Sequence, residues 1–331
     1  MNTFGIDARA KFFAAFSTVT ELSALTDLIP GTIKGQVSPV LILGGGSNLL
    51  FTGNYNGLVL KNNIAGIEKI SEDDEFVYVK AGAGENWHRF VLHCIDNNWA
   101  GVENLSLIPG NIGAGPMQNI GAYGVEIKEV FHELEAFHLQ DKTIVKFGLA
   151  DCAFGYRESI FKRKFKGQFA ILTVTCRLRK HPVFTTSYGA ITQELAKAGV
   201  KELSVKAISD AVIRIRSSKL PDPAVMGNAG SFFKNPEIPA DKFSVLKDQF
   251  PGIVGYPLED GRVKLAAGWL IEQCGWKGYR AGDAGCHANQ ALVLVNYGKA
   301  TGQEIYDLST RILESVKEKF DVALEREVNI V

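Results

Sequence analysis

Two glycine-rich stretches could hold a ligand through main-chain groups. Residues 109–127 combine glycines, amides and small side chains with almost no charge. Glycines adopt backbone angles closed to other residues and let a ligand approach the main chain. Successive backbone N–H groups in such a loop can form a concave anion site, so a diphosphate could be held without a lysine. A plain turn between two strands is the alternative, but a connection of this length is usually functional or disordered.

The second stretch is Gly44-Gly45-Gly46-Ser47-Asn48, which follows the apolar run 39–43. This order predicts a buried strand that enters a tight turn. A Rossmann dinucleotide fingerprint needs glycine or alanine three positions after the last glycine of the run, where Leu49 stands. The dehydrogenase interpretation is therefore weakened. Side-chain donors from Ser47 and Asn48 suit a ligand with several oxygens, and a simple hairpin turn is the alternative.

Three polar residues have ordinary structural explanations when each is considered alone. Ser231 lies in a loop of small residues that would expose its hydroxyl, although a serine there could equally cap a helix. Arg157 lies in a turn and could be an ordinary surface charge. Glu327 stands at the start of the last apolar run, where a strand-end carboxylate is common. The residue types alone leave these alternatives open.

Composition excludes several classes of function. The 331 residues carry 36 Lys and Arg against 36 Asp and Glu, so no nucleic-acid or anionic-membrane partner is indicated. No apolar run approaches the roughly 20 residues of a membrane span, and the N-terminus lacks a signal-peptide core, so a cytoplasmic protein is expected. The five cysteines are scattered without a Cys-x-x-Cys pair, and the histidines form no metal motif. No metal site is predicted.

Hydrophobic periodicity predicts both helices and strands. A capping box at Thr301 and Glu304 predicts the start of the last helix. The predicted strands cover 39–43, 76–80, 130–139, 169–178, 290–296 and 327–331. The predicted helices cover 87–95, 190–198, 204–216, 265–274 and the segment from 301 to 320.

Several separate motifs, in this order along nearly the whole chain, carry a family resemblance. They are Gly44–Asn48, Ile108–Gly113 with Gln118–Gly124, Gly155–Glu158, Lys219–Pro223, Gly227–Pro236 and Gln290–Leu294. The set resembles the UDP-N-acetylenolpyruvoylglucosamine reductases, also called UDP-N-acetylmuramate dehydrogenases. The segment around Tyr188 and the helices after it resemble the longer, type I form, in which a tyrosine loop closes over the substrate. Chance agreement of all the motifs together is implausible.

The resemblance implies an α+β architecture with an FAD-binding fold of the vanillyl-alcohol-oxidase type. Two FAD-binding subdomains are expected over 1–66 and 67–216, the second containing the tyrosine-loop insertion. A C-terminal α+β domain over 217–331 is expected to bind the UDP-sugar, with the last strand returning to the active site. A monomer is expected.

The resemblance also implies a reaction in peptidoglycan precursor synthesis. FAD, bound non-covalently, would take a hydride from NADPH and pass it from flavin N5 to UDP-N-acetylglucosamine enolpyruvate, giving UDP-N-acetylmuramate. Ser231 would donate the proton, and Arg157 and Glu327 would stabilise the enol-like intermediate. An arginine fork suits a carboxylate or enediolate, and a hydroxyl can deliver a proton when neighbours hold it in a dry site. Lys219 or Lys234 could lower the pKa of this hydroxyl.

Further site residues follow from the matched motifs. The FAD contacts are expected from Gly44, Gly45, Gly46, Ser47, Asn48, Pro109, Gly110, Gly113, Ala114, Gly115, Gln118, Asn119, Gly121, Ala122 and Tyr123. The substrate contacts are expected from Tyr188, Lys219, Asn235 and Gln290, with Tyr156 as a neighbour of the site. For Lys219 and Asn235, a solvated linker charge and a turn residue are the alternatives.

The chain departs from the family pattern in three places. Ala114-Gly115 replaces two serines found in many relatives, so FAD contacts there would come from backbone N–H groups. Near the end, relatives usually show Glu-Pro-Glu-Val-Arg, where this chain has Glu325-Arg-Glu-Val-Asn329. Glu325 and Glu327 would lie on the same strand face, and only the family register selects Glu327. The first glycine loop has no His or Cys that could attach a flavin covalently.

Two other functions are compatible with these motifs. An FAD-linked oxidase acting on an alcohol or amine would show rapid reaction of the reduced flavin with oxygen. A nucleotide-binding module without flavin would be colourless. The second is disfavoured because both glycine loops and all three candidate catalytic residues are present.

Overall fold

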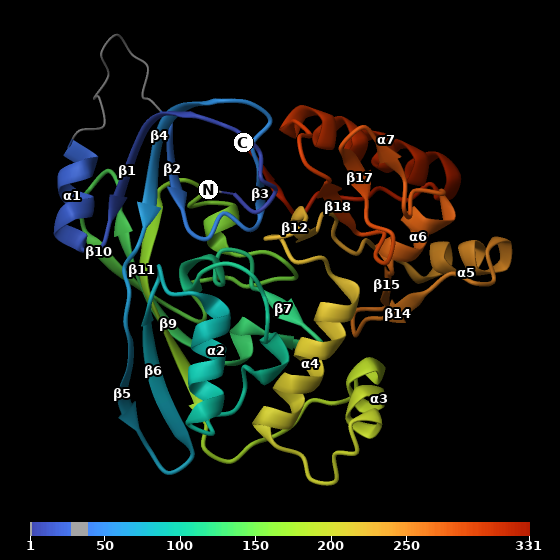
Figure 1. The fold of residues 1–331 in the computed structure, drawn as a ribbon. Coiled ribbons are helices and arrows are strands. Elements are labelled where there is room, and N and C mark those ends of the chain that lie inside the picture. The colour runs from blue at the N-terminus through green and yellow to red at the C-terminus, as the bar shows by residue number, and fades with distance from the viewer. Residues whose placement is uncertain (1, 28–38) are drawn as a thin grey trace. The chain divides into compact units, whose positions relative to one another are not determined.

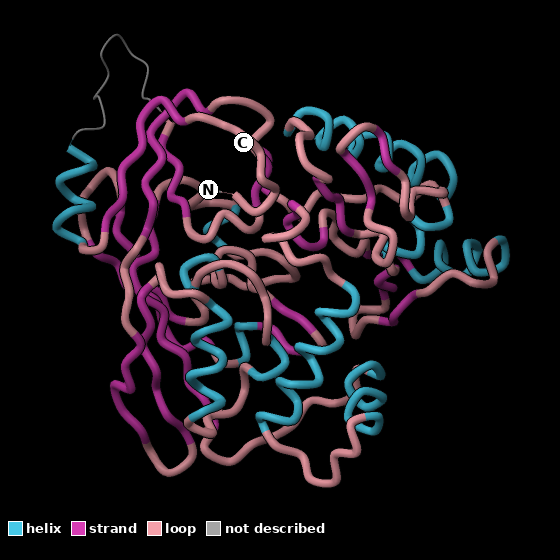
Figure 2. The backbone as a smooth tube through the Cα atoms, in the orientation of Figure 1, coloured by secondary structure: helices cyan, strands magenta, loops and turns pink. Residues whose placement is uncertain are grey.

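The computed structural model describes residues 2–27 and 39–331, which form two compact units with both helices and strands (Figures 1 and 2). The C-terminal unit comprises Met1–Arg9, Gly46–Tyr55 and Lys219–Val331, and the N-terminal unit comprises Ala10–Gly45 and Asn56–Ser218. The mixture of elements confirms the predicted α+β class. The division into three domains stays a prediction.

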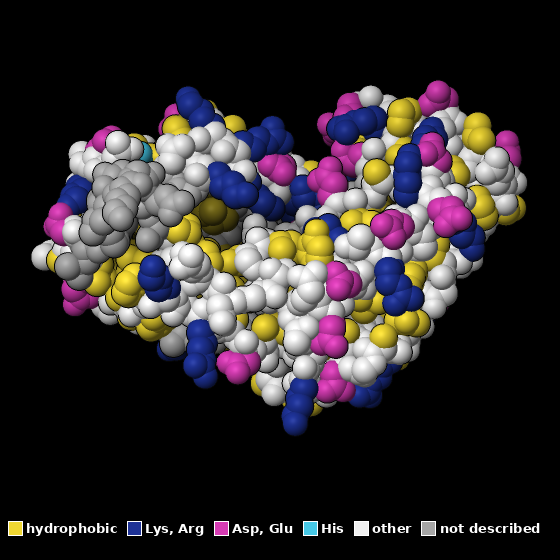
Figure 3. Space-filling view, turned by 90° about the horizontal axis from the view of Figure 1, so that it is seen from above, with side chains coloured by type: hydrophobic (Ala, Val, Ile, Leu, Met, Phe, Trp, Pro, Cys, Tyr) yellow, Lys and Arg dark blue, Asp and Glu magenta, His cyan; other side chains and the backbone are white. Residues whose placement is uncertain are grey.

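No helix in the described residues combines the length and the apolar character that a membrane span requires. Figure 3 shows one face of the molecule, on which basic and acidic side chains are interspersed. Charges of opposite sign are therefore mixed on that face, in keeping with the equal numbers of basic and acidic residues in the sequence.

The N-terminal unit is built on a five-stranded antiparallel sheet in the order β10-β9-β11-β6-β5. The strands are β5 (Ile67–Glu72), β6 (Phe76–Gly82), β9 (Phe131–His138), β10 (Ile144–Gly148) and β11 (Phe169–Arg179). The predicted strands at 76–80, 130–139 and 169–178 are thereby confirmed. The apolar side of this sheet contributes most of the strand residues in the main core of the unit.

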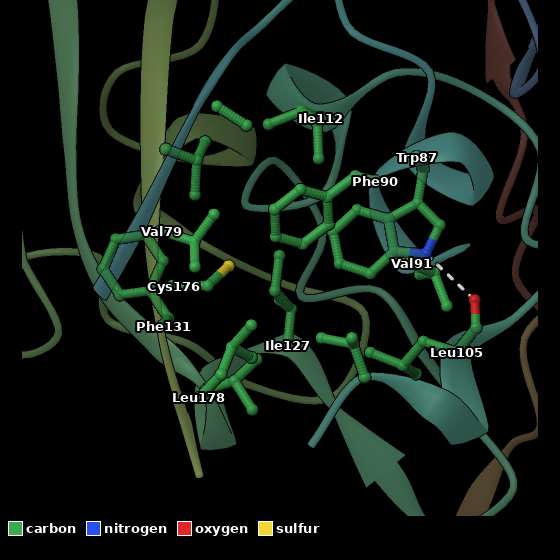
Figure 4. Close-up of a cluster of buried hydrophobic side chains, with 14 of the residues drawn as sticks. Val79, Trp87, Phe90, Val91, Leu105, Ile112, Ile127, Phe131, Cys176 and Leu178 are labelled. Atoms are coloured by element: carbon green, nitrogen blue, oxygen red, sulfur yellow. Dashed lines mark hydrogen bonds between the residues drawn. The ribbon is translucent and has the colours of Figure 1, made fainter. Parts of the chain in front are cut away.

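Helix α2 (Trp87–Asp96) provides the other side of that core (Figure 4). Asn86 caps its start by accepting a hydrogen bond from the N–H of Arg89, and the apolar residues recur at helical spacing. Trp87 is fully buried, and its indole N–H donates to the carbonyl of Leu105 at 2.9 Å. Burial of the ring therefore leaves no unsatisfied donor. The aromatic residues of α2 are core residues.

A second, three-stranded sheet in the order β1-β4-β2 leads into the first glycine loop. It contains β1 (Ala10–Phe16), β2 (Val40–Leu43) and β4 (Tyr55–Asn62). Strands β2 and β4 are parallel, with Leu43 opposite Lys61. The last residue of β2 is followed directly by Gly44, so β4 places Lys61 beside the start of the loop. Helix α1 (Val19–Asp27) packs its Leu22 into a core shared with β4.

The N-terminal unit ends in two helices, α3 (Gly189–Lys197) and α4 (Val205–Lys219). They share a small apolar core that includes Ile191, Ile208 and Val212. Both helices confirm the helical segments that hydrophobic periodicity predicted at 190–198 and 204–216. Short strands β7 (Gly121–Ala122) and β8 (Val125–Glu126) form a hairpin inside the second glycine stretch.

In its described residues, the C-terminal unit contains three small sheets and three helices. The sheets are ordered β12-β18-β17-β16, β13-β15-β14 and β19-β3. The strands are β3 (Leu49–Leu50), β12 (Gly227–Ser231), β13 (Glu237–Pro239), β14 (Gly255–Pro257), β15 (Arg262–Leu265), β16 (Arg280–Ala281), β17 (Ala284–Cys286), β18 (Val293–Asn296) and β19 (Asn329–Ile330), and the helices are α5 (Ala240–Gln249), α6 (Ala267–Gln273) and α7 (Gly302–Phe320). The predicted capping box of α7 is confirmed.

Three predicted boundaries in this unit were wrong. Leu265 does not begin a helix, because it pairs with Gly255 as the last residue of β15. The strand predicted from Gln290 begins only at Val293, because the Gln290 side-chain oxygen accepts the N–H of Leu292 and turns the chain. The closing strand is limited to β19, so Glu327 precedes it.

The first residue of α7 gives a stability prediction. A Cβ added at Gly302 would lie 1.6 Å from the carbonyl oxygen of Phe51, a backbone atom that cannot rotate away. We expect Gly302→Ala to lower the free energy of unfolding by about 3 kcal/mol, which a thermal melt followed by circular dichroism would detect.

Gly189 is a matched control, since it is the first residue of α3 and has no atom within 4 Å of an added Cβ. Gly189→Ala is expected to be neutral or stabilising by up to about 1 kcal/mol. Equal melting temperatures for the two variants would show that the approach of Phe51 does not constrain Gly302.

Candidate active site

The two glycine stretches meet inside the N-terminal unit. A Cβ on Gly45 would lie 2.9 Å from the Cα of Gly110 and 2.8 Å from the side-chain oxygen of Asn111. Gly110 itself has a φ of +110°, which a residue with a side chain rarely adopts. Glycine is therefore required at Gly45 for the close approach and at Gly110 for the backbone angle.

Main-chain donors remain available at this meeting point. In the described part of the chain, no group accepts a hydrogen bond from the N–H of Gly45. The carbonyl of Gly44 accepts a hydrogen bond from the ammonium of Lys61. In a trans peptide the C=O and the next N–H point in opposite directions, so the Gly45 N–H points away from Lys61. A backbone donor of this kind suits an anionic ligand.

The second glycine stretch is held tightly against β6. Gly113 donates its N–H to the carbonyl of Ala83 at 3.0 Å, and an added Cβ would lie 2.7 Å from the Cβ of Ala83. Ile112–Ala114 forms a single 3-10 turn. A Cβ on Gly115 would meet Ile127 at 2.9 Å. The small residues expected to contact FAD therefore also allow the loop to pack closely.

Asn119 is the centre of a hydrogen-bond network in this loop. It is fully buried at a φ of +47°, and its amide donates to Glu126 at 2.8 Å and to the carbonyl of Gly155 at 3.0 Å. Its side-chain oxygen accepts the N–H of Lys128. Loss of this amide would leave several buried groups unsatisfied. Asn119 therefore has a structural role that the sequence did not indicate.

Arg157 is attached to the same loop. Gly155 and Glu158 exchange backbone hydrogen bonds, so Tyr156 and Arg157 form the tip of a tight turn. Arg157 has a φ of +55°, a strained angle for a residue with a side chain. Its guanidinium donates to the carbonyl of Gly121 at 2.7 Å. This contact aligns the candidate catalytic arginine with the second glycine stretch.

A second arginine and two tyrosines extend this cluster. The hydroxyl of Tyr123 and the guanidinium of Arg216 form a hydrogen bond, and Arg216 also donates to the carbonyl of Leu107 at 3.2 Å. Burial is the main factor that lowers the pKa of Arg216, and the nearby charge of Arg157 acts in the same direction. The Tyr123 and Tyr188 rings pack edge to face at 5.4 Å. Two guanidinium groups close together favour an anionic ligand.

Ser231 is the last residue of β12, and its side chain is exposed. The helix-cap alternative is therefore wrong. The pairing of β12 with β18 is irregular between Asn228 and Ser231, where Gly230 has a φ of +69°. Such a bulge turns the side chain that follows it away from the regular alternation of the strand. The bulge sets the direction of the Ser231 hydroxyl.

Glu327 is placed beside the Ser231 segment by backbone contacts. The N–H of Glu327 donates to the carbonyl of Phe232 at 2.8 Å, and the backbones of Arg326 and Phe233 form an isolated antiparallel β-bridge. The carbonyl of Glu327 accepts a hydrogen bond from the amide of Asn48 at 3.4 Å. A candidate catalytic carboxylate, the chain next to Ser231 and a residue of the first glycine loop therefore lie together within the C-terminal unit.

Two candidate substrate residues meet at the start of α6. The side-chain oxygen of Asn235 accepts the N–H of Ala267 at 3.0 Å. A Cβ on Gly268 would lie 3.2 Å from the Gln290 side-chain oxygen. Lys219 is exposed at the end of α4. The structure therefore brings Asn235 and Gln290 to one helix start and places Lys219 on a different element.

The remaining residues that were expected to contact FAD or the substrate differ in how far they are exposed. Pro109, Gly45 and Ala114 are exposed, Ser47 and Gly46 are buried, and Gln118, Ala122 and Tyr156 are half-buried. The sequence analysis missed Lys61 and Arg216. Only an unusual charge within an otherwise apolar strand or helix could have indicated either residue, because their partners lie far away in sequence.

Comparisons with known proteins identify the family. Residues 25–148 match the model of an FAD binding domain, and residues 222–331 match the UDP-N-acetylenolpyruvoylglucosamine reductase C-terminal domain. A UDP-N-acetylenolpyruvoylglucosamine reductase of Amoebophilus asiaticus is 52% identical over 331 residues, covering 100% of this chain and 96% of that protein. One from Pseudomonas putida is 50% identical over 99% of this chain and 96% of that protein.

A solved structure supports the same fold. The UDP-N-acetylenolpyruvylglucosamine reductase of Thermus caldophilus aligns with a TM-score of 0.66 at 23% identity, covering 99% of this chain and 95% of that one. The predicted resemblance is therefore confirmed by full-length relatives and by both domain matches. The chain belongs to the UDP-N-acetylenolpyruvoylglucosamine reductase family and is an FAD-dependent oxidoreductase.

Proposed function

We propose that this enzyme uses NADPH and FAD to reduce UDP-N-acetylglucosamine enolpyruvate to UDP-N-acetylmuramate, a precursor of peptidoglycan. The observation that carries the proposal is the attachment of Arg157 to the second glycine stretch through the carbonyl of Gly121 at 2.7 Å. This contact joins a group suited to a carboxylate with a loop inside the match to the FAD-binding domain.

The residues fit FAD in the shape and the donors that they offer. Gly45 and Gly110 approach too closely for a side chain on Gly45, and the N–H of Gly45 has no acceptor in the described residues. Backbone N–H groups of the two loops would hold the diphosphate, with Ser47 and Asn48 as further donors. FAD, when bound, supplies the carrier that takes a hydride from NADPH and passes it to the enolpyruvyl double bond.

The side chains of this protein would complete the reduction. As the hydride reaches the β-carbon, negative charge spreads into the neighbouring carboxylate, and the Arg157 guanidinium would stabilise that charge with two donors in one plane. Glu327 would stabilise the same enol-like intermediate. The Ser231 hydroxyl would then give its proton to the α-carbon, so one hydride and one proton are added across the double bond.

The substrate would be held by residues from several separate segments. Lys219 offers a cation for the diphosphate, and Asn235 and Gln290 offer amides at the start of α6. Tyr188, at the start of α3, would close over the substrate. Its ring contact with Tyr123 supports this assignment, because it places Tyr188 beside a residue of the second glycine stretch.

Anaerobic spectroscopy of the purified holoenzyme tests the proposed function. The flavin should bleach on addition of NADPH and regain its colour when UDP-N-acetylglucosamine enolpyruvate is added in the absence of oxygen. Bleached flavin that recovers only on admission of oxygen, and recovers rapidly, would favour an oxidase instead. A colourless protein that cannot be reconstituted with FAD would contradict the assignment of both glycine loops.

A further inference from the structure

Lys61 is a charged residue in the middle of an apolar segment. It lies on β4, between the fully buried Leu60 and the buried Asn62, and its own side chain is half-buried. Burial lowers its pKa, as expected when an ammonium group loses water. A bound anion near the ammonium would offset this loss of water.

The residues that the structure describes provide no acidic partner for this lysine. Among residues 2–27 and 39–331, no carboxylate forms an ion pair with Lys61, and its one hydrogen bond goes to the carbonyl of Gly44. By contrast, Lys80 on the neighbouring sheet is also partly buried and pairs with Glu135 at 2.6 Å. The ammonium of Lys61 is thus directed at the first glycine loop and keeps further donors that no carboxylate occupies.

The contact with Gly44 also orients the loop. Because the Gly44 carbonyl is turned toward Lys61, the N–H of Gly45 points to the opposite side, where no group of the described chain accepts it. The positive charge on the carbonyl side polarises the peptide and strengthens that N–H as a donor. One lysine therefore fixes the direction of a loop donor and adds positive charge to a loop that has none in its own sequence.

We propose that Lys61 is a positioning residue of the FAD site. It holds the Gly44–Gly45 peptide so that the N–H of Gly45 faces the FAD diphosphate, and its own positive charge offsets the charge of the diphosphate. The inference rests on the proposed placement of FAD at the glycine loops. It changes the expectation from the sequence, in which the two loops would hold the diphosphate without a lysine.

The test measures FAD affinity rather than turnover. Wild-type holoenzyme is deflavinated and reconstituted, and the dissociation constant for FAD is measured by flavin fluorescence at 50 and 500 mM NaCl. Lys61→Met should weaken FAD binding about 10- to 100-fold at low salt, as expected for the loss of a charge-assisted contact. The dissociation constant of the variant divided by that of the wild type should be smaller at high salt, because salt screens the charge that the variant lacks.

Lys80→Met is the matched control, since it removes a partly buried strand lysine that already has a carboxylate partner. It should leave the dissociation constant for FAD unchanged. If Lys61→Met melts at a much lower temperature, Lys61→Gln keeps a donor for Gly44 and removes only the charge, and it should still show the salt-dependent loss.

The outcomes separate this inference from the proposed function. Wild-type protein that fails to bind FAD would end the proposed function itself. Wild-type protein that binds FAD, together with lysine variants that bind it equally well, would overturn only the role of Lys61. A loss that is the same at both salt concentrations would also overturn it, because that result indicates a packing role without charge.

Discussion

Ser231→Ala is expected to separate the two halves of the reaction. Reduction of the flavin by NADPH should stay within about twofold of wild type, because the hydroxyl takes no part in it. Reoxidation by UDP-N-acetylglucosamine enolpyruvate should slow by about 10² to 10⁴, the usual contribution of a positioned proton donor. Stopped-flow absorbance of the flavin, recorded separately with each substrate, measures both rates in one preparation.

Ser244→Ala is a suitable control, because Ser244 is an exposed serine of α5 in the same unit. It should leave both rates unchanged. Equal losses of both half-reactions in Ser231→Ala would show that Ser231 supports the structure of the site and is not the proton donor. The bulge at Gly230 makes that outcome a real alternative, because Ser231 also pairs with Val293.

Features set by neighbouring residues could be predicted from the sequence. The start of α7 depends on Thr301 and Glu304, which bond to each other across one turn, so the motif and the structure coincide. The same holds for α2, where apolar spacing alone defines the buried face. Local patterns carried enough information because each partner lies within a few residues.

Features that depend on distant pairing could not be predicted in this way. Leu265 is apolar and adjacent to a helix, but its pairing with Gly255 makes it a strand residue. Lys61 reaches the first glycine loop only because β2 and β4 pair in parallel, with Leu43 opposite Lys61. Arg216 meets Tyr123 and Leu107 across about a hundred residues of sequence. Hydrophobic periodicity does not predict contacts between residues that are so distant in the sequence.

The two glycine stretches show which details the sequence could not supply. Glycine at Gly45 is explained by the approach of Gly110, which composition suggested only in general terms. Asn119 was expected to contact FAD, yet its amide is already used to connect the loop to Gly155 and Glu126. Residues selected by family motif can therefore act on the cofactor through the loop that they hold.

Arg157→Lys tests the other half of the proposed chemistry, and it should lower kcat by about 10² or more. Arg157 is held at a φ of +55° and one of its nitrogens donates to Gly121, so the direction of its planar group is fixed. A lysine carries the same charge, but its compact ammonium cannot bond Gly121 and also present two parallel donors to a carboxylate. Because the interaction is proposed to strengthen in the intermediate, kcat should fall more than KM rises.

Arg163→Lys is the matched control, since Arg163 is an exposed arginine that follows the same turn and pairs with Glu158 at 2.9 Å. It should change kcat by less than about twofold, as expected for a surface ion pair. Near-normal turnover of Arg157→Lys would refute the catalytic role. Loss of FAD from Arg157→Lys, seen as a fall in the flavin absorbance of the purified protein, would instead show that Arg157 mainly supports the second glycine stretch. Retained flavin with a slow second half-reaction is the result that the fixed guanidinium predicts.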